Sequence, residues 1–100
     1  SKPIANILDG TIDLITSKFS LYQFNACPFC VKVRRQIRKF SLTVELRDAK
    51  NNIVYKEELI SQGGAHKVPC LRIENNVNQI EWLYGSKEII TYLKTELQLP

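Results

Sequence analysis

The chain has 100 residues, a length that predicts a single domain. Apolar residues make up 44 % of it and charged residues 24 %, a balance that excludes an intrinsically disordered chain and predicts one compact core. Its net charge of +4 is mild for a nucleic-acid-binding protein, and no apolar stretch reaches the roughly 18 residues that a membrane span needs.

The first 18 residues predict a helical extension in front of the main domain. Apolar residues recur at helical spacing over residues 4–16, with two aspartates on the opposite side. We therefore expect an extra N-terminal helix within residues 1–18, packed on a domain that comprises residues 19–100.

A strand, a helix and a second strand follow, joined by short connections. Residues 19–24 are aromatic and almost continuously apolar, which is typical of a central buried strand. Helically spaced apolar residues predict a helix over 28–40. Residues 43–47 alternate, which predicts a strand with Val44 and Leu46 facing the core and the polar residues facing solvent. Such a βαβ unit is normally parallel and right-handed.

The second half of the chain predicts a helix, a hairpin and a final helix. Residues 53–61 predict a short helix, and residues 68–73 and 77–84 predict two antiparallel strands joined by a turn at 74–76. Ser86 is a good N-cap for the last helix. A parallel βαβ half followed by a ββα half is the thioredoxin-like α/β arrangement, a four-stranded mixed sheet with helices on both faces.

Two of the three cysteines form a Cys-x-x-Cys pair after the first strand. An odd cysteine count does not suit a secreted disulfide scaffold, and this pair at the start of a βαβ unit is typical of a redox motif. Pro28 is favoured in the first helical turn, so Cys27 should lie at a helix N-terminus, where backbone N–H groups stabilise a thiolate. We expect Cys27 to be the nucleophile and Cys30, one turn later, to be the resolving thiol.

Other interpretations of the cysteines remain open at this point. A zinc half-site is one alternative, because Cys70 and His66 can in principle complete a set of four ligands. A purely structural pair of buried thiols is another. For Cys70 the simplest interpretation is a small core residue, with a regulatory or glutathionylated thiol as the minority one. His66 is most simply a surface loop residue, although it can also help to bind an anionic substrate.

A cluster of five basic residues follows the cysteine pair directly. Its members are Lys32, Arg34, Arg35, Arg38 and Lys39. Such a basic helix is most often a solvated face, and a nucleic-acid surface is a second interpretation. A third is a local positive field that favours a thiolate and an anionic thiol substrate. The position of the cluster beside Cys27 favours this third interpretation more than a basic helix elsewhere would.

Two further motifs suit a small peptide ligand. Val68-Pro69 is by default an ordinary strand edge, but a cis proline would expose the backbone N–H and C=O of Val68 to a peptide such as glutathione. Gly85-Ser86 is first a strand stop and a helix start. A helix N-terminus is also a ready carboxylate site, and glutathione has two carboxylates.

The ordered combination of these motifs over about residues 19–97 resembles the glutaredoxins. The matching stretches are Leu21-Tyr22-Gln23-Phe24, Cys27-Pro28-Phe29-Cys30, Val68-Pro69 and Gly85-Ser86. The resemblance implies that Cys27 forms a mixed disulfide with glutathione and that Cys30 completes a dithiol mechanism, as a redox-active disulfide with Cys27. It further implies that Val68 with Pro69 pairs with the glutathione backbone, and that Gly85 with Ser86 holds the γ-glutamyl carboxylate.

The chain departs from the glutaredoxin pattern at three places. Many members have a lysine shortly before the first cysteine, where this chain has Phe24-Asn25-Ala26. Phe29 replaces the commoner tyrosine, and Gly85 is followed by serine rather than by acidic residues. This turn, together with Val-Pro-Cys-Leu, also resembles the N-terminal half of glutathione S-transferases.

The resemblance therefore implies an enzyme, a glutathione-dependent thiol–disulfide oxidoreductase of electron transport and cell redox homeostasis. Glutathione is the expected co-substrate, without a bound cofactor or metal, and disulfide-containing or glutathionylated proteins are the expected partners. We expect a monomer that does not bind nucleic acid, in the cytoplasm or another reducing compartment, with a membrane tether preceding Ser1 as an open alternative. The alternative functions are a glutathione-ligated iron–sulfur cluster carrier and the thioredoxin-like domain of a glutathione S-transferase.

Overall fold

The computed structural model describes residues 15–76 and 79–99. Nearly all of the helix predicted over residues 4–16 lies outside this part, and only its last two residues are described, in helical conformation. The division into an extension (1–18) and a domain (19–100) therefore stays a prediction. None of the helices in the described part is long and apolar enough to span a membrane.

Within residues 15–76 and 79–99, four strands and three helices follow one another in the predicted order. They are β1 (Phe19–Gln23), α2 (Pro28–Lys39), β2 (Glu45–Asp48), α3 (Ile53–Ser61), β3 (Cys70–Asn76), β4 (Gln79–Tyr84) and α4 (Ser86–Glu96). The sheet order is β2-β1-β3-β4, with β1 parallel to β2 and antiparallel to β3, and with β3 antiparallel to β4. This mixed sheet confirms the predicted thioredoxin-like α/β fold.

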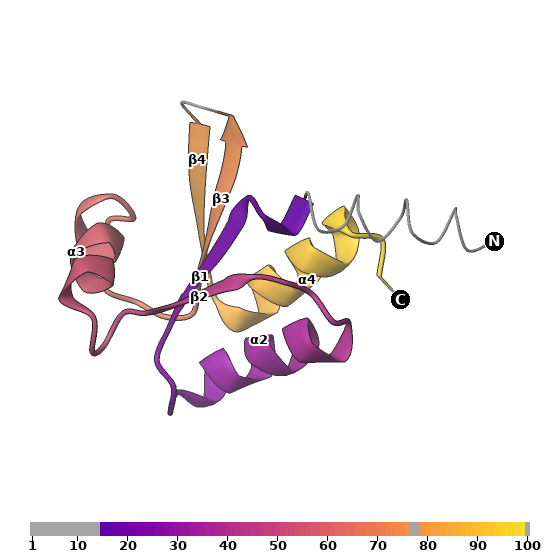
Figure 1. Cartoon of the computed structure of the whole chain (residues 1–100), viewed down its shortest axis with the longest axis horizontal. Coiled ribbons are helices and arrows are strands. Elements are labelled where there is room, and N and C mark those ends of the chain that lie inside the picture. Colours follow the sequence, from indigo (N-terminus) through magenta and orange to yellow (C-terminus); the bar gives the residue numbers. More distant parts are fainter. Residues whose placement is uncertain (1–14, 77–78, 100) are drawn as a thin grey trace.

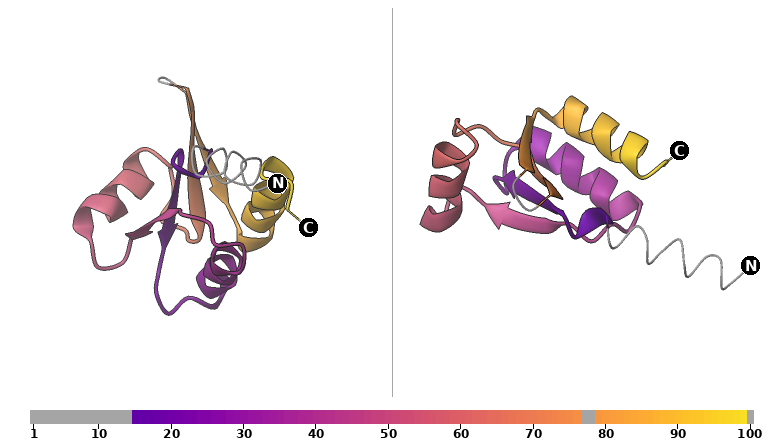
Figure 2. Two further views of the ribbon diagram at one scale, coloured as in Figure 1. Left: turned by 45° about the vertical axis from the view of Figure 1, so that its right-hand side comes forward. Right: turned by 90° about the horizontal axis from the view of Figure 1, so that it is seen from above.

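Helices cover both faces of the sheet, as predicted. Helices α2 and α4 lie side by side on one face, and α3 lies on the other (Figures 1 and 2). Every residue of β1 is buried, which confirms the expected central strand. The larger core cluster joins the sheet to α2 and α4 around Leu21, Val33, Ile89 and Leu93. A smaller cluster lies under α3 and includes Cys70.

Strand β2 departs from its predicted burial. Leu46 was expected to face the core, yet 46 % of its surface is exposed, because β2 is an edge strand that the helices do not cover fully. Arg47 was expected to face solvent, yet its guanidinium donates to the Tyr22 hydroxyl oxygen at 2.7 Å and lies 3.3 Å from Glu58 of α3. The second face of the sheet is covered by α3, so a residue on that face is not a solvent residue.

The hairpin turn predicted at residues 74–76 is wrong. Strand β3 continues through these residues, and Asn76 still pairs with Gln79, with an irregularity between Glu74 and Asn76. Strand β3 also begins at Cys70 rather than at residue 68. An asparagine-containing segment is a turn candidate by local propensity, but pairing with β4 outweighs that propensity here.

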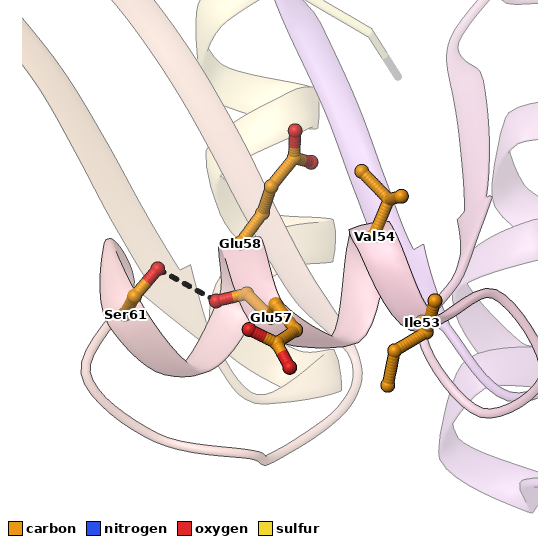
Figure 3. Close-up of a pocket in the computed structure, with 5 residues that line it drawn as sticks. All are labelled: Ile53, Val54, Glu57, Glu58 and Ser61. Atoms are coloured by element: carbon orange, nitrogen blue, oxygen red, sulfur yellow. Dashed lines mark hydrogen bonds between the residues drawn. The ribbon is translucent and has the colours of Figure 1, made fainter.

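Helix α3 buries little apolar surface against the sheet. Leu59 is its one buried residue in the described structure, whereas Ile53 and Val54 are 64 % and 60 % exposed. Figure 3 shows these two residues beside a pocket of about 370 Å³. Asn52 is the N-cap of α3, and its side chain accepts hydrogen bonds from the amides of Val54 and Tyr55. The contacts of Glu58 with Tyr22 and Arg47 therefore contribute to holding α3 on the sheet.

Candidate functional site

The three sequence motifs meet at one edge of the sheet. Tyr22 in β1 pairs with Cys70 in β3, and Cys70 pairs with Tyr84 in β4. The loop after β1, the segment before β3 and the turn after β4 therefore leave the sheet at the same edge. A hydrogen bond of 3.2 Å from the Gly85 amide to the Pro69 carbonyl joins two of these segments directly.

Cys27 lies at the start of α2, as the sequence predicted. It is the N-cap residue, Pro28 occupies the first turn, and the thiol is partly exposed. Burial raises the pKa of the Cys27 thiol, but the backbone N–H of Cys30, its thiol, the Phe29 N–H and the Arg34 guanidinium outweigh burial and lower that pKa below its ordinary value. The site thus favours the thiolate at this position.

Cys30 is fully buried and has the opposite character. The Phe24 amide donates to its sulfur at 3.4 Å. Burial raises the pKa of Cys30 to about 11, and the neighbouring Cys27 adds to the rise. The two thiols of the motif are therefore unequal: Cys27 is partly exposed with a lowered pKa, and Cys30 is buried with a raised pKa.

Arg34 is a site residue that the sequence interpretation did not single out from its basic cluster. Its guanidinium donates to the side-chain oxygen of Gln23, to the Phe24 carbonyl at 3.3 Å and to the Asn25 carbonyl at 2.8 Å. It therefore braces the loop that leads into Cys27, while its charge helps to lower the pKa of Cys27. A spacing of seven residues, two helical turns from Cys27, is the signal that places Arg34 on the same side of α2.

The lowered pKa predicts how Cys27 reacts with an alkylating reagent as pH changes. We expect the rate of iodoacetamide modification to reach half its plateau at a pH below the value of about 8.5 for a free cysteine. Arg34→Gln removes a cation that favours the thiolate, so its midpoint should move to higher pH and its rate at pH 7 should fall.

Arg35→Gln is the matched control, because Arg35 is exposed on the same helix and is absent from the groups that shift Cys27. Modification followed by mass spectrometry of peptides gives the rate at Cys27 alone. Equal midpoints in the two variants would contradict the role of Arg34.

The Val68–Pro69 peptide bond is cis. The segment that leads to it is fastened by Tyr84, whose hydroxyl donates to the Gly63 carbonyl at 2.8 Å, with the Ala65 carbonyl at 3.3 Å. Tyr84 thus connects the end of β4 to the loop between α3 and β3. The sequence alone does not indicate this role, because a contact between distant segments leaves no local pattern.

Gly63 occupies a crowded position in this loop. A Cβ atom there would lie 2.6 Å from the Leu59 carbonyl oxygen and 2.7 Å from the Tyr84 hydroxyl. We expect Gly63→Ala to lower the free energy of unfolding by about 1–3 kcal/mol, the usual cost of overpacking. Urea denaturation measures this change. Gln62→Ala, an exposed neighbour, should stay within about 0.5 kcal/mol of wild type; similar costs for both variants would contradict the crowding.

The turn at Gly85 opens α4. Gly85 itself is the N-cap, with a φ of 97° that favours glycine, and Ser86 is the first helical residue. The prediction that Ser86 is the N-cap is therefore wrong by one position. A Cβ atom at Gly85 would also meet the carboxylate of Glu88, which lies at the same helix end.

The remaining predicted residues do not form a metal site. Cys70 is fully buried in the cluster under α3, where burial raises its pKa to about 12. His66 is exposed, with its ring 3.3 Å from the Ala49 carbonyl oxygen and edge-on to Phe24. Within residues 15–76 and 79–99, no three His, Cys, Asp or Glu side chains gather as a metal site would require. The zinc half-site therefore finds no support in this arrangement.

Comparison with known proteins places this geometry in context. The glutaredoxin family model matches residues 16–77. Prostaglandin E synthase 2 of Danio rerio is 37 % identical over 78 residues; these cover 78 % of this chain and 19 % of that protein, so the chain spans about a fifth of the relative.

Two solved structures share the fold. A thioredoxin-like protein superposes with a TM-score of 0.67 at 22 % identity, over 83 % of this chain and 97 % of the other. Maleylacetoacetate isomerase from Anaeromyxobacter dehalogenans, with glutathione bound in its active site, superposes with a TM-score of 0.62 at 20 % identity, over 83 % of this chain and 39 % of the other.

Proposed function

Because the chain belongs to the glutaredoxin family, we propose that it is a glutathione-dependent oxidoreductase that reduces disulfides, in particular mixed disulfides between proteins and glutathione. The observation that carries this proposal is the inequality of the two thiols at the start of α2. Cys27 is accessible with a lowered pKa, and Cys30 is buried with a raised one. Such a pair suits nucleophilic thiol–disulfide exchange.

The proposed reaction begins at Cys27. Its thiolate attacks the glutathione sulfur of a mixed disulfide, so the substrate's S–S bond breaks and the protein thiolate leaves and takes up a proton. A disulfide between Cys27 and glutathione remains. The thiolate of a second glutathione molecule then attacks the glutathione sulfur of this adduct, which releases glutathione disulfide and restores the Cys27 thiolate. The second glutathione is therefore the reductant: its thiolate sulfur ends in glutathione disulfide, while the first glutathione sulfur passes from one disulfide to the next.

Cys30 offers a second way to resolve the adduct. Its sulfur attacks Cys27, glutathione leaves as the thiol, and a Cys27–Cys30 disulfide forms. This step needs the Cys30 thiolate, and a pKa of about 11 keeps that form scarce at neutral pH. The part of this rise that comes from Cys27 is lost once Cys27 is in a disulfide, but the part that comes from burial remains. External glutathione should therefore be the faster resolving thiol.

The edge where the three segments meet supports a glutathione site beside Cys27. Val68 with its cis-proline neighbour offers backbone groups for the tripeptide. The start of α4 at Ser86 offers backbone N–H groups for a carboxylate, whereas the Gly85 N–H already donates to the Pro69 carbonyl. We expect glutathionylated proteins to be the substrates, a monomer to suffice for activity, and a reducing compartment to be the place of action.

The decisive measurement is glutathione-coupled reduction of the mixed disulfide of 2-mercaptoethanol and glutathione. We expect turnover that saturates with the disulfide, and a protein that gains one glutathione on Cys27 when glutathione disulfide is supplied alone. Turnover would be read from NADPH consumption by added glutathione reductase, and the adduct from intact mass. A protein that shows no turnover and forms no adduct would contradict the proposal.

A second candidate is the thioredoxin-like domain of a larger enzyme that binds glutathione without exchanging a disulfide. It is favoured by the small share, about a fifth, of the curated relative that this chain spans. Such a domain should bind glutathione yet form no disulfide at Cys27. The adduct experiment therefore separates the two candidates.

A further inference from the structure

The positive charge of the chain is concentrated on α2. This helix of 12 residues carries five of the 14 lysines and arginines and none of the ten aspartates and glutamates. The other 88 residues hold nine cations against ten anions and have a net charge of −1. The net positive charge of the whole chain is thus a property of the helix that begins at Cys27.

Four of these cations form an exposed surface, which we call the basic face. Its members are Lys32, Arg35, Arg38 and Lys39. The first, second and fourth of them follow at i, i+3 and i+7, so they lie in one row along the helix. The fifth cation, Arg34, is turned instead toward the loop before Cys27.

The basic face has no acidic partner among the residues that the structure describes. The ion pairs found there involve Arg47 and Arg72. Lys32 and Lys39 each lie over a phenylalanine ring, at 5.9 and 5.4 Å, which leaves their charge uncompensated. An uncompensated row of charge on a low-dielectric surface creates a local field that attracts anions.

An apolar side chain separates the basic face from the reactive thiol. Phe29 follows Cys27 by two residues and is 57 % exposed. The Lys32 ammonium lies over its ring. A ligand that extends from the Cys27 sulfur along the helix would therefore meet an apolar contact first and a row of cations after it.

We propose that the basic face binds an acidic polypeptide segment next to the disulfide of the protein substrate. The inference rests on the proposed function of Cys27 and adds the class of substrate. Phe29 packs against the segment near the reacting cysteine, and the cations meet acidic side chains further along. The basic face discriminates between substrates mainly through the rate at which the two proteins associate, because exposed charges accelerate association more than they strengthen the final complex.

The length of the face fits a short stretch of extended chain. At about 1.5 Å per residue, Lys32 lies about 7 Å and Lys39 about 18 Å along the helix from Cys27. An extended polypeptide covers this distance with about six residues. Glutathione, with three residues, spans only about 10 Å and does not reach the far cations. The face therefore matches the protein partner of a mixed disulfide rather than its glutathione part.

The test compares peptides that differ only in their charge. Peptides of 13 residues would carry a central glutathionylated cysteine and, within six residues of it, four glutamates, four glutamines or four lysines. We expect kcat/KM at low ionic strength to be about tenfold higher for the acidic peptide than for the neutral one, and lowest for the basic one. The advantage should fall below about twofold in 0.5 M NaCl, where charges are screened within a few ångströms.

The double variant Arg35→Glu/Arg38→Glu should reverse the order of the three peptides. Arg35→Gln/Arg38→Gln should abolish the preference for the acidic peptide without reversing it. This neutral variant keeps the test valid if Arg35→Glu/Arg38→Glu folds poorly. Lys18→Glu/Lys56→Glu is the matched control, because it changes net charge equally at positions off α2 and should keep the wild-type order. Turnover of the small mixed disulfide should remain within twofold in all of these variants.

Several outcomes would overturn the inference. One is a wild-type enzyme that turns over the small disulfide but does not distinguish the peptides. Another is a preference that both arginine double variants retain. A third is an oligonucleotide that binds wild type more tightly than the acidic peptide at 0.15 M NaCl, which would assign the face to nucleic acid. If wild type does not turn over the small mixed disulfide, that result counts against the proposed function instead. Binding of cysteine-free peptides, measured by fluorescence anisotropy, would still test the basic face in that case.

Discussion

Cys27→Ser should abolish glutathione-dependent disulfide reduction, with a fall in kcat/KM on the order of 10³-fold or more. The reacting species is a thiolate, and the serine hydroxyl neither ionises near neutral pH nor forms a disulfide. Cys27 is partly exposed at the helix start, so the substitution should leave the fold intact. The measurement is the coupled assay with the small mixed disulfide, together with a thermal unfolding curve.

Cys30→Ser is the matched comparison, with the same atomic change one helical turn away. It should keep at least about a tenth of the wild-type rate, because a second glutathione molecule can resolve the adduct without Cys30. The Phe24 amide that now donates to the Cys30 sulfur can donate to the new oxygen. A folded Cys30→Ser protein without turnover would show that the dithiol route is obligatory, and an active Cys27→Ser protein would assign the nucleophile elsewhere.

Leu21→Ala should have the largest effect on stability, lowering the free energy of unfolding by about 3–4 kcal/mol. Leu21 is fully buried in the central strand, between β2 and β3, and packs in the cluster under α2 and α4. Its removal costs the transfer energy of the lost methyl groups and leaves a cavity that a close-packed core fills only in part. Such a loss is a large fraction of the 5–15 kcal/mol of a typical domain.

Leu46→Ala provides the control for this loss. Leu46 is the register partner of Leu21 in β2, but 46 % of its surface is exposed. The same truncation should therefore cost less than about 1 kcal/mol. Urea denaturation of the two variants at one temperature gives both values, provided that the slopes agree. Equal losses would mean that β2 is as well covered in solution as β1.

Short-range patterns were sufficient for most of the fold. The apolar run of β1, the proline after Cys27 and the apolar periodicity of α2 each depend on neighbouring residues, and they placed the strand, the start of α2 and the length of that helix at or near their observed bounds. The motif order also placed Cys27, Val68 and Gly85 on segments that meet at one edge.

The misassigned residues depend on contacts between distant segments. Arg47 alternates with apolar neighbours and was expected in solvent, but α3 returns over that face of the sheet and brings Glu58 to it. The site roles of Arg34 and Tyr84 arise in the same way, because each side chain donates to backbone carbonyls of another element. Only the folded chain defines such partners.

The unequal environments of the three cysteines have a practical consequence for labelling. A reagent that needs a thiolate meets one thiol with a lowered pKa, at Cys27, and two buried thiols with pKa values of about 11 and 12. A maleimide dye at neutral pH should therefore attach to one place, at the mouth of the proposed site, without removal of the other cysteines. The natural chain thus carries its own attachment point for a fluorescent or spin probe at the start of α2.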